Sequence, residues 1–390
     1  MKKIQEAVEN LVVGGGPAGS MLAMRLADAG RQVVVLEKEP MNHHKVCGEF
    51  LSRETVEYLQ QAGLSPIELG AAPIRCIRFS TGRRAVYANL PFRAFSLSRY
   101  VLDGVMLERA EERGCEVRRG VFVDRVEPHD REWRVQLRDG RAIRARNVFL
   151  ANGKHDLHGW DRSEGTQCDL VGFKMHWQLN HVQTKAMRGI MELFLFPGGY
   201  GGLSLIETEV ANLCMVVHRD ELRRIGAWGE LFAAILSENP HLLQRMQGAE
   251  ALWDRPLAIS PIPYGYLIQK PCGIWCVGDQ AAVVPSFTGD GLAIALHSGA
   301  LAAQMHLAGA SPDEYHRELT SQLSRGMSLA TRLSRIMLTR IGRGIAPLSL
   351  WLFPGAIRWI ANSTRIPEDA ILVGKEKPRL EPTRHREHIA

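Results

Sequence analysis

Apolar and polar positions in the first 40 residues follow a strand–helix–strand pattern. Leu11–Val13 and Gln32–Leu36 are short, mostly apolar runs of the buried-strand type. Between them, residues 20–29 carry only two charged side chains, which is typical of a helix buried on most sides. Gly30 follows as a C-terminal stop for that helix. The pattern predicts one unit of a Rossmann-type parallel sheet.

A glycine-rich turn joins the first predicted strand to the helix. Its glycines match the G-x-G-x-x-G fingerprint, in which the first permits a tight turn and the second lets a pyrophosphate approach the backbone. The third brings helix and strand close together, and the free N–H groups of the helix start attract phosphates. An acid at the end of the second strand accepts hydrogen bonds from a ribose diol. The dinucleotide site is therefore assigned to Gly14, Gly16, Ala18, Gly19, Glu37 and Lys38.

A second motif, far along the chain, indicates which dinucleotide is bound. Residues 273–277 form an apolar run that ends in Gly278-Asp279, and a glycine-rich segment then leads into an apolar helix ending near Leu307. Together with the N-terminal fingerprint, this motif resembles the FAD-dependent superfamily of group A flavin monooxygenases and geranylgeranyl reductases, with the p-hydroxybenzoate hydroxylase-like fold. The resemblance covers most of the first 330 residues and implies non-covalently bound FAD. It places Asp279 on the ribityl chain and the helix start at the pyrimidine edge of the flavin. The residues of that helix start are Gly289, Asp290, Gly291 and Leu292.

The same resemblance extends to segments between the two motifs. An arginine that opens an amphipathic helix contacts FAD in the superfamily, which implies this role for Arg99 at the start of the helix 98–112; a surface arginine is the alternative. Residues 116–126 read as paired strand, and the Val123 backbone would lie against the adenine. Asn152 replaces an aspartate that assists FAD and NADPH binding in group A hydroxylases. No second G-x-G-x-x-G follows a strand, so electrons are expected from transiently docked NADPH or NADH, or from an electron-donor partner.

The middle of the chain lacks the strand–helix rhythm. Short stretches separated by turns containing Gly or Asn predict antiparallel sheet at 172–179, 190–196, 202–207 and 210–217. A helical stretch is predicted over 221–247. The substrate is assigned to this region, and the flavin ring to the seam between the two domains, where ligand pockets form.

The predicted fold class is α/β, with a discontinuous Rossmann-type FAD-binding domain, an antiparallel-sheet substrate domain and a C-terminal helical region. The FAD-binding domain comprises residues 1–70, 95–158 and 268–330, and the substrate domain residues 71–94 and 159–267. The C-terminal region comprises a helical cap at 331–373 and a flexible tail at 374–390. An apolar stretch with tryptophan and arginine, residues 345–361, is expected to pack over the pocket in preference to a membrane interface.

Two short motifs bear on the branch of the superfamily. Lys45–Glu49 resembles a Cys-Gly segment near the flavin of geranylgeranyl reductases, which makes Cys47 and Glu49 the candidate catalytic residues. The alternatives are a buried small hydrophobe for Cys47 and a capping or solvated acid for Glu49. The stretch 193–202 resembles a segment that lines the lipid pocket of these enzymes, with sheet core as the alternative. It implies substrate-binding roles for Phe194, Phe196, Pro197 and Tyr200.

Composition says more about the location and partners of the protein than about its reaction. The 390 residues are 45% hydrophobic and 23% charged, as in ordinary globular proteins, and the net charge of +6 selects no anionic partner, so no nucleic acid is expected. The sequence shows no signal peptide and no apolar run long enough to span a membrane. Seven scattered cysteines without a C-x-x-C pair indicate reduced thiols in a cytoplasm. His43 and His44 are adjacent and cannot readily share a metal, and no cluster has metal-ligand spacing, so no metal site is expected. The prediction is a cytoplasmic protein, with peripheral membrane contact through the C-terminal region as the alternative.

The resemblance implies an FAD-dependent oxidoreductase that acts on a hydrophobic small molecule. The breadth of the superfamily favours a monooxygenase that hydroxylates an aromatic or polyketide-like substrate through a flavin C4a-hydroperoxide. Cys47, Asn152 and the Phe196-Pro197 pair favour the alternative, a geranylgeranyl-reductase-like enzyme acting on an unsaturated isoprenoid or lipid chain. A flavin-dependent halogenase and a non-catalytic FAD-bound carrier are the remaining alternatives.

Overall fold

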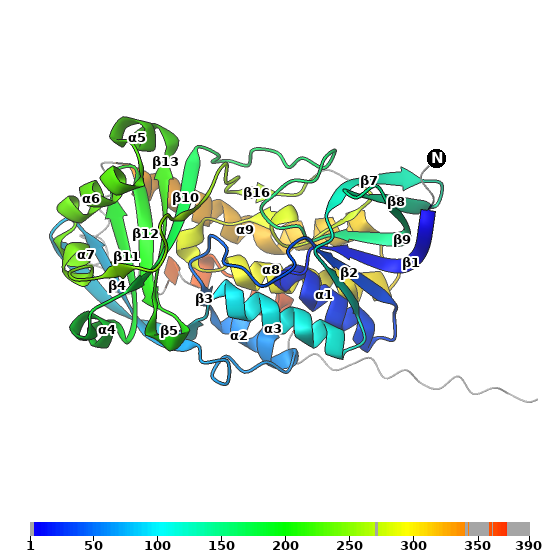
Figure 1. Cartoon of the computed structure of the whole chain (residues 1–390), viewed down its shortest axis with the longest axis horizontal. Coiled ribbons are helices and arrows are strands. Elements are labelled where there is room, and N and C mark those ends of the chain that lie inside the picture. The colour runs from blue at the N-terminus through cyan, green and yellow to red at the C-terminus, as the bar shows by residue number, and fades with distance from the viewer. Residues whose placement is uncertain (1–3, 270–271, 340–341, 343–358, 361, 373–390) are drawn as a thin grey trace, which may run out of the picture.

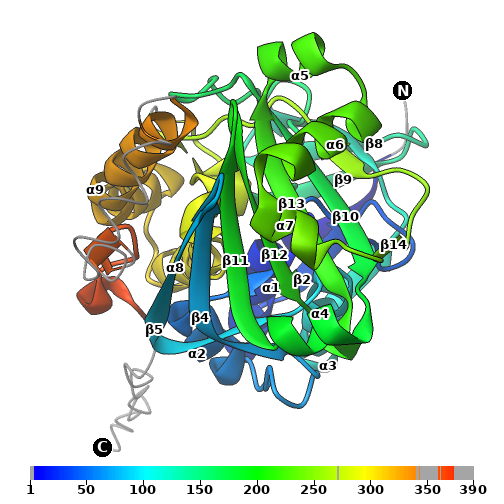
Figure 2. The same ribbon diagram turned by 90° about the vertical axis from the view of Figure 1, so that its left-hand side faces the viewer.

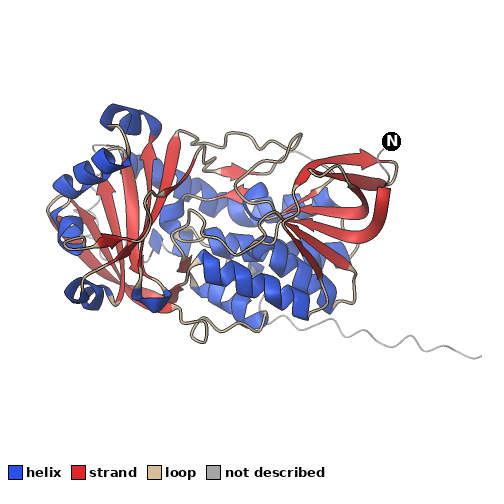
Figure 3. Cartoon of the chain, viewed as in Figure 1, coloured by secondary structure: helices blue, strands red, loops and turns tan. Residues whose placement is uncertain are grey.

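The computed structural model describes residues 4–269, 272–339, 342, 359–360 and 362–372. The chain forms two sheets at opposite ends of the molecule, with helices between them and on their faces (Figures 1 and 3). This arrangement confirms the predicted α/β class. The predicted tail 374–390 and almost all of the apolar stretch 345–361 lie outside the described residues.

The first sheet contains both predicted nucleotide motifs. Its strands are β1 (Ile4–Val13), β2 (Val33–Glu37), β6 (Glu116–Arg119), β7 (Val123–His129), β8 (Glu132–Leu137), β9 (Ala142–Leu150) and β17 (Trp275–Cys276). Strands β6, β2, β1, β9 and β17 pair in parallel, and β9, β8 and β7 form an antiparallel meander. Every residue of β2 is buried, as expected of a parallel strand covered on both faces. The paired strand predicted over 116–126 is two separate strands, β6 and β7.

Helices cover the first sheet and separate it from the second. They are α1 (Pro17–Asp28), α2 (Arg53–Gln61), α3 (Arg99–Glu112), α8 (Gly291–Leu307) and α9 (Pro312–Leu338). The start of α3 is fixed by Ser98, whose hydroxyl accepts a hydrogen bond from the Val101 N–H, and α9 starts with a capping box between Ser311 and Glu314. Helices α1 and α8 cross closely because Gly299 has no Cβ; one placed there would lie 2.3 Å from the Ala18 carbonyl oxygen.

The second sheet is mainly antiparallel. Its strands are β3 (Phe50–Leu51), β4 (Ala72–Thr81), β5 (Arg84–Ser96), β10 (Leu170–Gln178), β11 (Gly189–Phe196), β12 (Gly199–Leu205), β13 (Ala211–His218), β14 (Glu250–Ala251) and β15 (Leu257–Ile259). The order is β14–β10–β13–β12–β11–β4–β5–β3, with β15 also on β10. A short ladder joins β16 (Tyr266–Leu267) to β18 (Ala282–Val283). The strands predicted in the middle region correspond to β10, β11, β12 and β13.

Short helices cover the outer face of the second sheet (Figure 2). They are α4 (His181–Met187), α5 (Arg219–Ile225), α6 (Trp228–Glu238) and α7 (Pro240–Arg245). The helical stretch predicted over 221–247 is therefore divided between three helices. Gly226 separates the first two with φ of 118°, and Pro240, which has no N–H, opens the third after Asn239.

Two features of the fold bear on the predicted domain division, which itself stays a prediction. Helix α9 runs through residue 330, where the FAD-binding domain was expected to give way to the C-terminal cap. Strand β3 pairs with β5, so residues 50–51, which the prediction placed in the FAD-binding domain, belong to the second sheet. In the described part of the chain, none of the helices combines the length and apolar character needed to cross a bilayer.

Candidate functional site

A cavity of about 1130 Å³ extends from the glycine-rich turn after β1 to the inner face of the second sheet. Its wall contains Gly14, Gly16 and Glu37 at the first sheet, and Ile77, Met191 and Leu193 at the second. Ligand pockets are commonly about 300–1000 Å³, so this volume is large for one small molecule. The cavity has room for a dinucleotide together with a second ligand.

The three glycines of the turn have separate structural roles. Gly14 has φ of 109°, and a Cβ there would lie 2.4 Å from the Ala151 carbonyl oxygen. A Cβ on Gly19 would lie 2.0 Å from the Gly14 carbonyl oxygen, so this glycine brings α1 against β1. At Gly16 the nearest atom to a Cβ would be an Arg99 nitrogen at 3.7 Å, so the space beside Gly16 is open to the cavity. These positions agree with the roles predicted for a turn that admits a pyrophosphate.

Glu37 lies at the end of β2 with its carboxylate held by two backbone groups. It accepts hydrogen bonds from the N–H of Gly15 at 2.8 Å and of Glu39 at 3.0 Å. Lys38 and Val123 also contribute to this part of the cavity wall. The acid, the lysine and the Val123 segment are thus gathered where the adenosine part of the dinucleotide was expected.

Arg99 lies beside Gly16 and is not a surface arginine. Its side chain is only 14% exposed and forms two hydrogen bonds to Asp103, from Nε at 2.5 Å and from Nη2 at 2.8 Å. Lys45 Nζ reaches the same carboxylate at 2.8 Å. Burial alone would raise the pKa of Asp103, but Arg99 and Lys45 lower it to about 2. Two cations therefore share one carboxylate next to the open glycine, which leaves net positive charge for a pyrophosphate.

The second motif forms the opposite wall of the same part of the cavity. Gly278 has φ of 60° and donates its N–H to Ser298 Oγ at 2.8 Å, while Arg162 Nη1 donates to the Asp279 carbonyl oxygen at 2.9 Å. Asp279, Gly289, Gly291 and Leu292 lie in the wall. A Cβ on Gly289 would lie 2.6 Å from the Phe50 ring. The glycine-rich turn, the basic pair of Arg99 and Lys45, and the start of α8 therefore form a site whose residues fit FAD.

Asp290 does not take the place predicted for it. Among the described residues, Asp290 is not one of those that form the cavity wall. Its side chain is buried beneath the C-terminal segment. It accepts a hydrogen bond from Thr364 Oγ1 at 3.3 Å and lies 3.9 Å from Arg365 Nη1. Burial raises the pKa of Asp290 to about 6. The Asp290 side chain therefore packs against the C-terminal segment, while a role of its backbone in flavin binding stays a prediction.

The candidate catalytic residues Cys47 and Glu49 have different environments. Cys47 is half-buried in the cavity wall, where its Sγ accepts the Glu49 N–H at 3.3 Å. Glu49 is fully buried, ion-paired with Lys174, and accepts the Arg99 N–H at 2.8 Å; His176 Nε2 lies 3.5 Å away. Burial alone would raise the pKa of Glu49, but His176, Lys174 and the Arg99 N–H together lower it. An acid kept ionised in this way is a poor proton donor, which argues against the catalytic assignment of Glu49.

The four residues predicted to bind the substrate lie on one hairpin, and only part of this set reaches the cavity wall; the binding role itself stays a prediction. Strands β11 and β12 form a hairpin whose turn contains Pro197. The Phe194 ring lies 6.1 Å from the Phe196 ring, and both belong to the core between the second sheet and the outer helices. Phe194 and Tyr200 contribute to the cavity wall, whereas Phe196 and Pro197 do not.

Most of the residues that line this end of the cavity were not predicted from the sequence. They come from the inward positions of the second sheet and from α9: Leu193, Leu195, Cys214, Val216, Leu333, Ile336 and Met337. The two-residue period of β11 could have shown that Leu193 and Leu195 share a face opposite to Phe194 and Phe196. It could not have shown which of the two faces meets the ligand.

Comparisons with known proteins agree with this geometry. Residues 7–159 match the family model described as FAD binding domain. The chain is 25% identical to a menaquinone reductase of Mycobacterium tuberculosis, over 86% of this chain and 85% of the relative. It is 28% identical to digeranylgeranylglycerophospholipid reductase 2 of Methanopyrus kandleri, over 76% of each chain.

Solved structures share the fold at lower sequence identity. A myxobacterial chondrochloren halogenase superposes with a TM-score of 0.74 at 20% identity, covering 94% of this chain and 93% of the halogenase. A flavoprotein/dehydrogenase of Cytophaga hutchinsonii superposes with a TM-score of 0.70 at 17% identity, covering 92% and 96%. The sequence matches agree with the prediction: residues 7–159 match an FAD binding domain, and the chain is an FAD-dependent oxidoreductase. The structural matches show the shared fold.

Proposed function

We propose that the protein is a reductase that saturates a carbon–carbon double bond in an isoprenoid or lipid chain. The observation that carries the proposal is the apolar part of the cavity beyond the flavin residues. There the wall is built from aliphatic side chains of the second sheet, such as Ile77 and Leu195, and of α9, such as Leu333. Such a wall binds by excluding water from apolar surface and offers few groups that recognise a polar ligand.

The relatives that align over most of the chain support this choice. Both are named as reductases, and one name specifies a lipid with geranylgeranyl chains. Hydroxylation, which the breadth of the superfamily favoured, and halogenation would use the same fold. No contact among the described residues favours either of them over reduction, and likeness to the halogenase structures concerns the fold alone.

Reduction of a double bond requires a hydride, a proton and a site from which water is excluded. Bound FAD supplies the hydride in such enzymes. The backbone carbonyl of Cys47 accepts a hydrogen bond from Asn212 on β13 of the second sheet. Cys47 also contributes to the cavity wall. Tyr200, on the inner face of β12, accepts a hydrogen bond from Ser286 at 3.3 Å, and burial raises its pKa. Cys47 is thus the candidate for delivering the proton, and Tyr200 stays neutral and positions the substrate.

The proposal includes the source of the electrons. Besides the FAD residues, the cavity wall contains Arg138 and Lys154, whose charges suit an anionic nucleotide. We infer that NADPH or NADH docks there transiently. Anaerobic titration of the FAD-loaded protein with each nucleotide tests this step, because bleaching of the flavin absorbance reports reduction. A flavin that both nucleotides leave oxidised would point to a protein electron donor instead.

The reductase proposal is tested by mixing chemically reduced, FAD-loaded protein with an isoprenoid substrate in the absence of oxygen. A lipid bearing geranylgeranyl chains and an isoprenoid quinone are suitable substrates, and their fully saturated counterparts are the controls. We expect the absorbance of oxidised flavin to return only with the unsaturated molecules. Reoxidation that requires oxygen with every substrate would contradict the proposal.

A further inference from the structure

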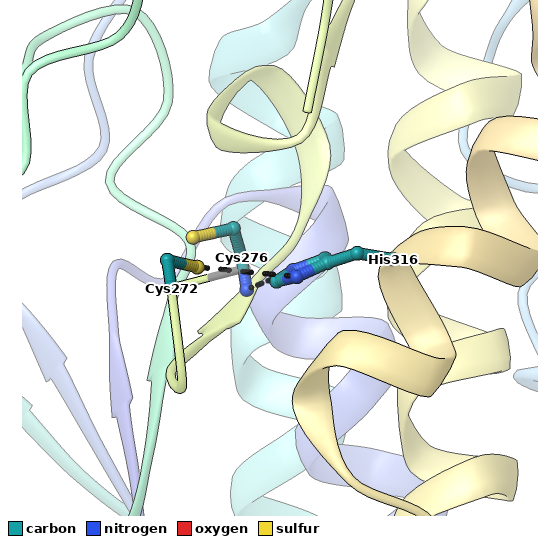
Figure 4. Close-up of side chains that lie close together, drawn as sticks. All are labelled: Cys272, Cys276 and His316. Carbon is teal, nitrogen blue, oxygen red and sulfur yellow. Dashed lines mark hydrogen bonds between the residues drawn. The ribbon is translucent and has the colours of Figure 1, made fainter. Parts of the chain in front are cut away.

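Two cysteines and a histidine meet at the back of the flavin domain, in a cluster that the sequence analysis did not detect. Cys272 and Cys276 are separated by three residues around the start of β17, and His316 reaches them from α9 (Figure 4). The two sulfurs and a ring nitrogen all lie within 4.8 Å of one another. None of the three residues lines the cavity described above. The cluster therefore has no part in the proposed reduction.

Hydrogen bonds fix the proton on the histidine ring. The backbone N–H of Cys276 can only donate, and it donates to His316 Nε2 at 3.1 Å. The neutral ring must then carry its proton on Nδ1, the nitrogen that faces Cys272 Sγ at 3.9 Å. His316 consequently offers an N–H group to the Cys272 sulfur and no free lone pair.

This arrangement disfavours a metal ion. A metal bound through Nδ1 would need that nitrogen deprotonated while Nε2 still accepts from the backbone, which would require an imidazolate. Structural zinc sites also use four ligands, and among the described residues only these three come together here. The nearby Asp313 carboxylate is engaged, since it accepts the N–H groups of Cys272 and Gly273 at 3.1 and 3.3 Å.

The two thiols differ in burial and in pKa, as the two cysteines of a redox pair do. Cys272 is half-buried, whereas Cys276 is buried on the strand. The neighbouring Cys276 and His316 lower the pKa of Cys272, while Cys272 and burial raise the pKa of Cys276. A more accessible thiol with a lowered pKa beside a buried thiol with a raised pKa is the arrangement of an attacking and a resolving cysteine.

We propose that Cys272 and Cys276 are a redox-active dithiol that a peroxide converts to an intramolecular disulfide. The Cys272 thiolate attacks one peroxide oxygen, which breaks the O–O bond, releases hydroxide and leaves a sulfenic acid on Cys272. The Cys276 thiol then attacks that sulfur, forms the S–S bond and releases water. The dithiol loses two electrons and the peroxide gains them. FAD, if bound and reduced when oxygen is present without substrate, would supply hydrogen peroxide as the oxidant.

The test counts free thiols in the FAD-loaded protein. Reduced protein, freed of reductant, receives hydrogen peroxide in limiting amount, is alkylated, and is weighed intact and as proteolytic fragments. We expect two of the seven cysteines, Cys272 and Cys276, to escape alkylation together, with a mass loss of two hydrogens that a dithiol reductant reverses. This should occur on the order of tenfold faster than oxidation of the half-buried Cys168, whose pKa is raised by burial and by Glu164.

Variants separate the two roles. In Cys276→Ser the sulfenic acid on Cys272 has no resolving partner and should be trapped by dimedone, whereas Cys168→Ser, the matched control, should still form the disulfide. Oxidation of other cysteines while Cys272 and Cys276 remain alkylatable would overturn the proposal. So would purified protein that holds one equivalent of metal and whose two thiols react only after chelation.

Discussion

Glu49 and Lys174 form an ion pair in which neither side chain is accessible to solvent. The two residues are 125 positions apart, with Glu49 in the turn before β3 and Lys174 on β10. The pair therefore ties the Cys47 turn to the substrate sheet. Removing one partner of a buried pair leaves an uncompensated charge, which makes this link costly to break.

We expect Lys174→Met to destabilise the protein by about 3–5 kcal/mol, because it leaves the Glu49 carboxylate buried without its cation. The double variant Glu49→Gln with Lys174→Met should recover much of that loss. Since the pKa of Glu49 is lowered in the folded protein, its contribution to stability is present above the pKa of an unfolded glutamate and is lost as the pH falls. Urea unfolding of the three proteins measures these differences, and a double variant no more stable than Lys174→Met would show that the pair is not coupled.

The flavin site is tested by Gly16→Val and Asp279→Ala. A Cβ on Gly16 has no atom nearer than 3.7 Å, so the variant should fold while its side chain occupies the space of the pyrophosphate. Loss of a charged hydrogen-bond partner at Asp279 should weaken FAD binding roughly 10- to 100-fold. Gly229→Ala is the control, because a Cβ there meets no atom within 4 Å. Full flavin content in both site variants, measured by absorbance, would refute the assignment.

The two faces of β11 should respond differently to substitution. Phe196 lies in the core under the outer helices, so Phe196→Ala should cost about 3–5 kcal/mol of stability and leave the KM unchanged. Leu193 lines the cavity, so Leu193→Trp should raise the KM for a long-chain substrate and leave the FAD content unchanged. Steady-state kinetics and urea unfolding together decide this. An altered KM in Phe196→Ala with unchanged stability would restore Phe196 to the substrate site.

Cys47 should be replaceable without loss of the cofactor. Its thiol lies in the cavity wall, and if it delivers the proton, Cys47→Ala should reduce kcat by about 100-fold while the protein stays loaded with FAD. Cys76→Ala serves as the control, since Cys76 is half-buried on β4 and outside the cavity wall. Unchanged kinetics in Cys47→Ala would make this cysteine a packing residue.

Asp290 should make stability depend on pH in a predictable direction. Burial raises its pKa from 3.8 to about 6, so the unfolded chain loses the proton first as the pH rises. Stability should therefore fall between about pH 4 and pH 6, by up to about 3 kcal/mol. Asp290→Asn cannot ionise, and its stability relative to the wild-type protein should increase over that range. Unfolding measured across the range would contradict this if the difference between the two proteins stayed constant.

The parts of the site that depend on local geometry were predictable from sequence. Gly14 and Gly19 are needed for close contacts within one strand–helix unit or with the strand beside it, and Gly16 leaves open space for the ligand. The start of α3 at Arg99 and the helix α8 to Leu307 also follow from caps and apolar periodicity.

The parts that depend on tertiary contacts were not predictable. Both faces of the second sheet are covered, so the alternation along β11 could not reveal whether Phe196 or Leu195 faces the ligand. The partner of Glu49 is Lys174 on β10, 125 residues away, and His316 reaches Cys272 from a helix 44 residues away. Asp290 belongs to the second flavin motif, yet its side chain accepts a hydrogen bond from Thr364 in the C-terminal segment, a partner that the motif does not reveal.

The most direct measurement of the proposed reaction is the mass of the product made by the FAD-loaded protein with its electron donor, in sealed anaerobic vessels and in air. If the protein is a reductase, the geranylgeranyl lipid should gain two hydrogens for each double bond reduced, and should do so without oxygen. A product that forms only in air and is heavier by one oxygen atom would contradict the reductase and identify a monooxygenase.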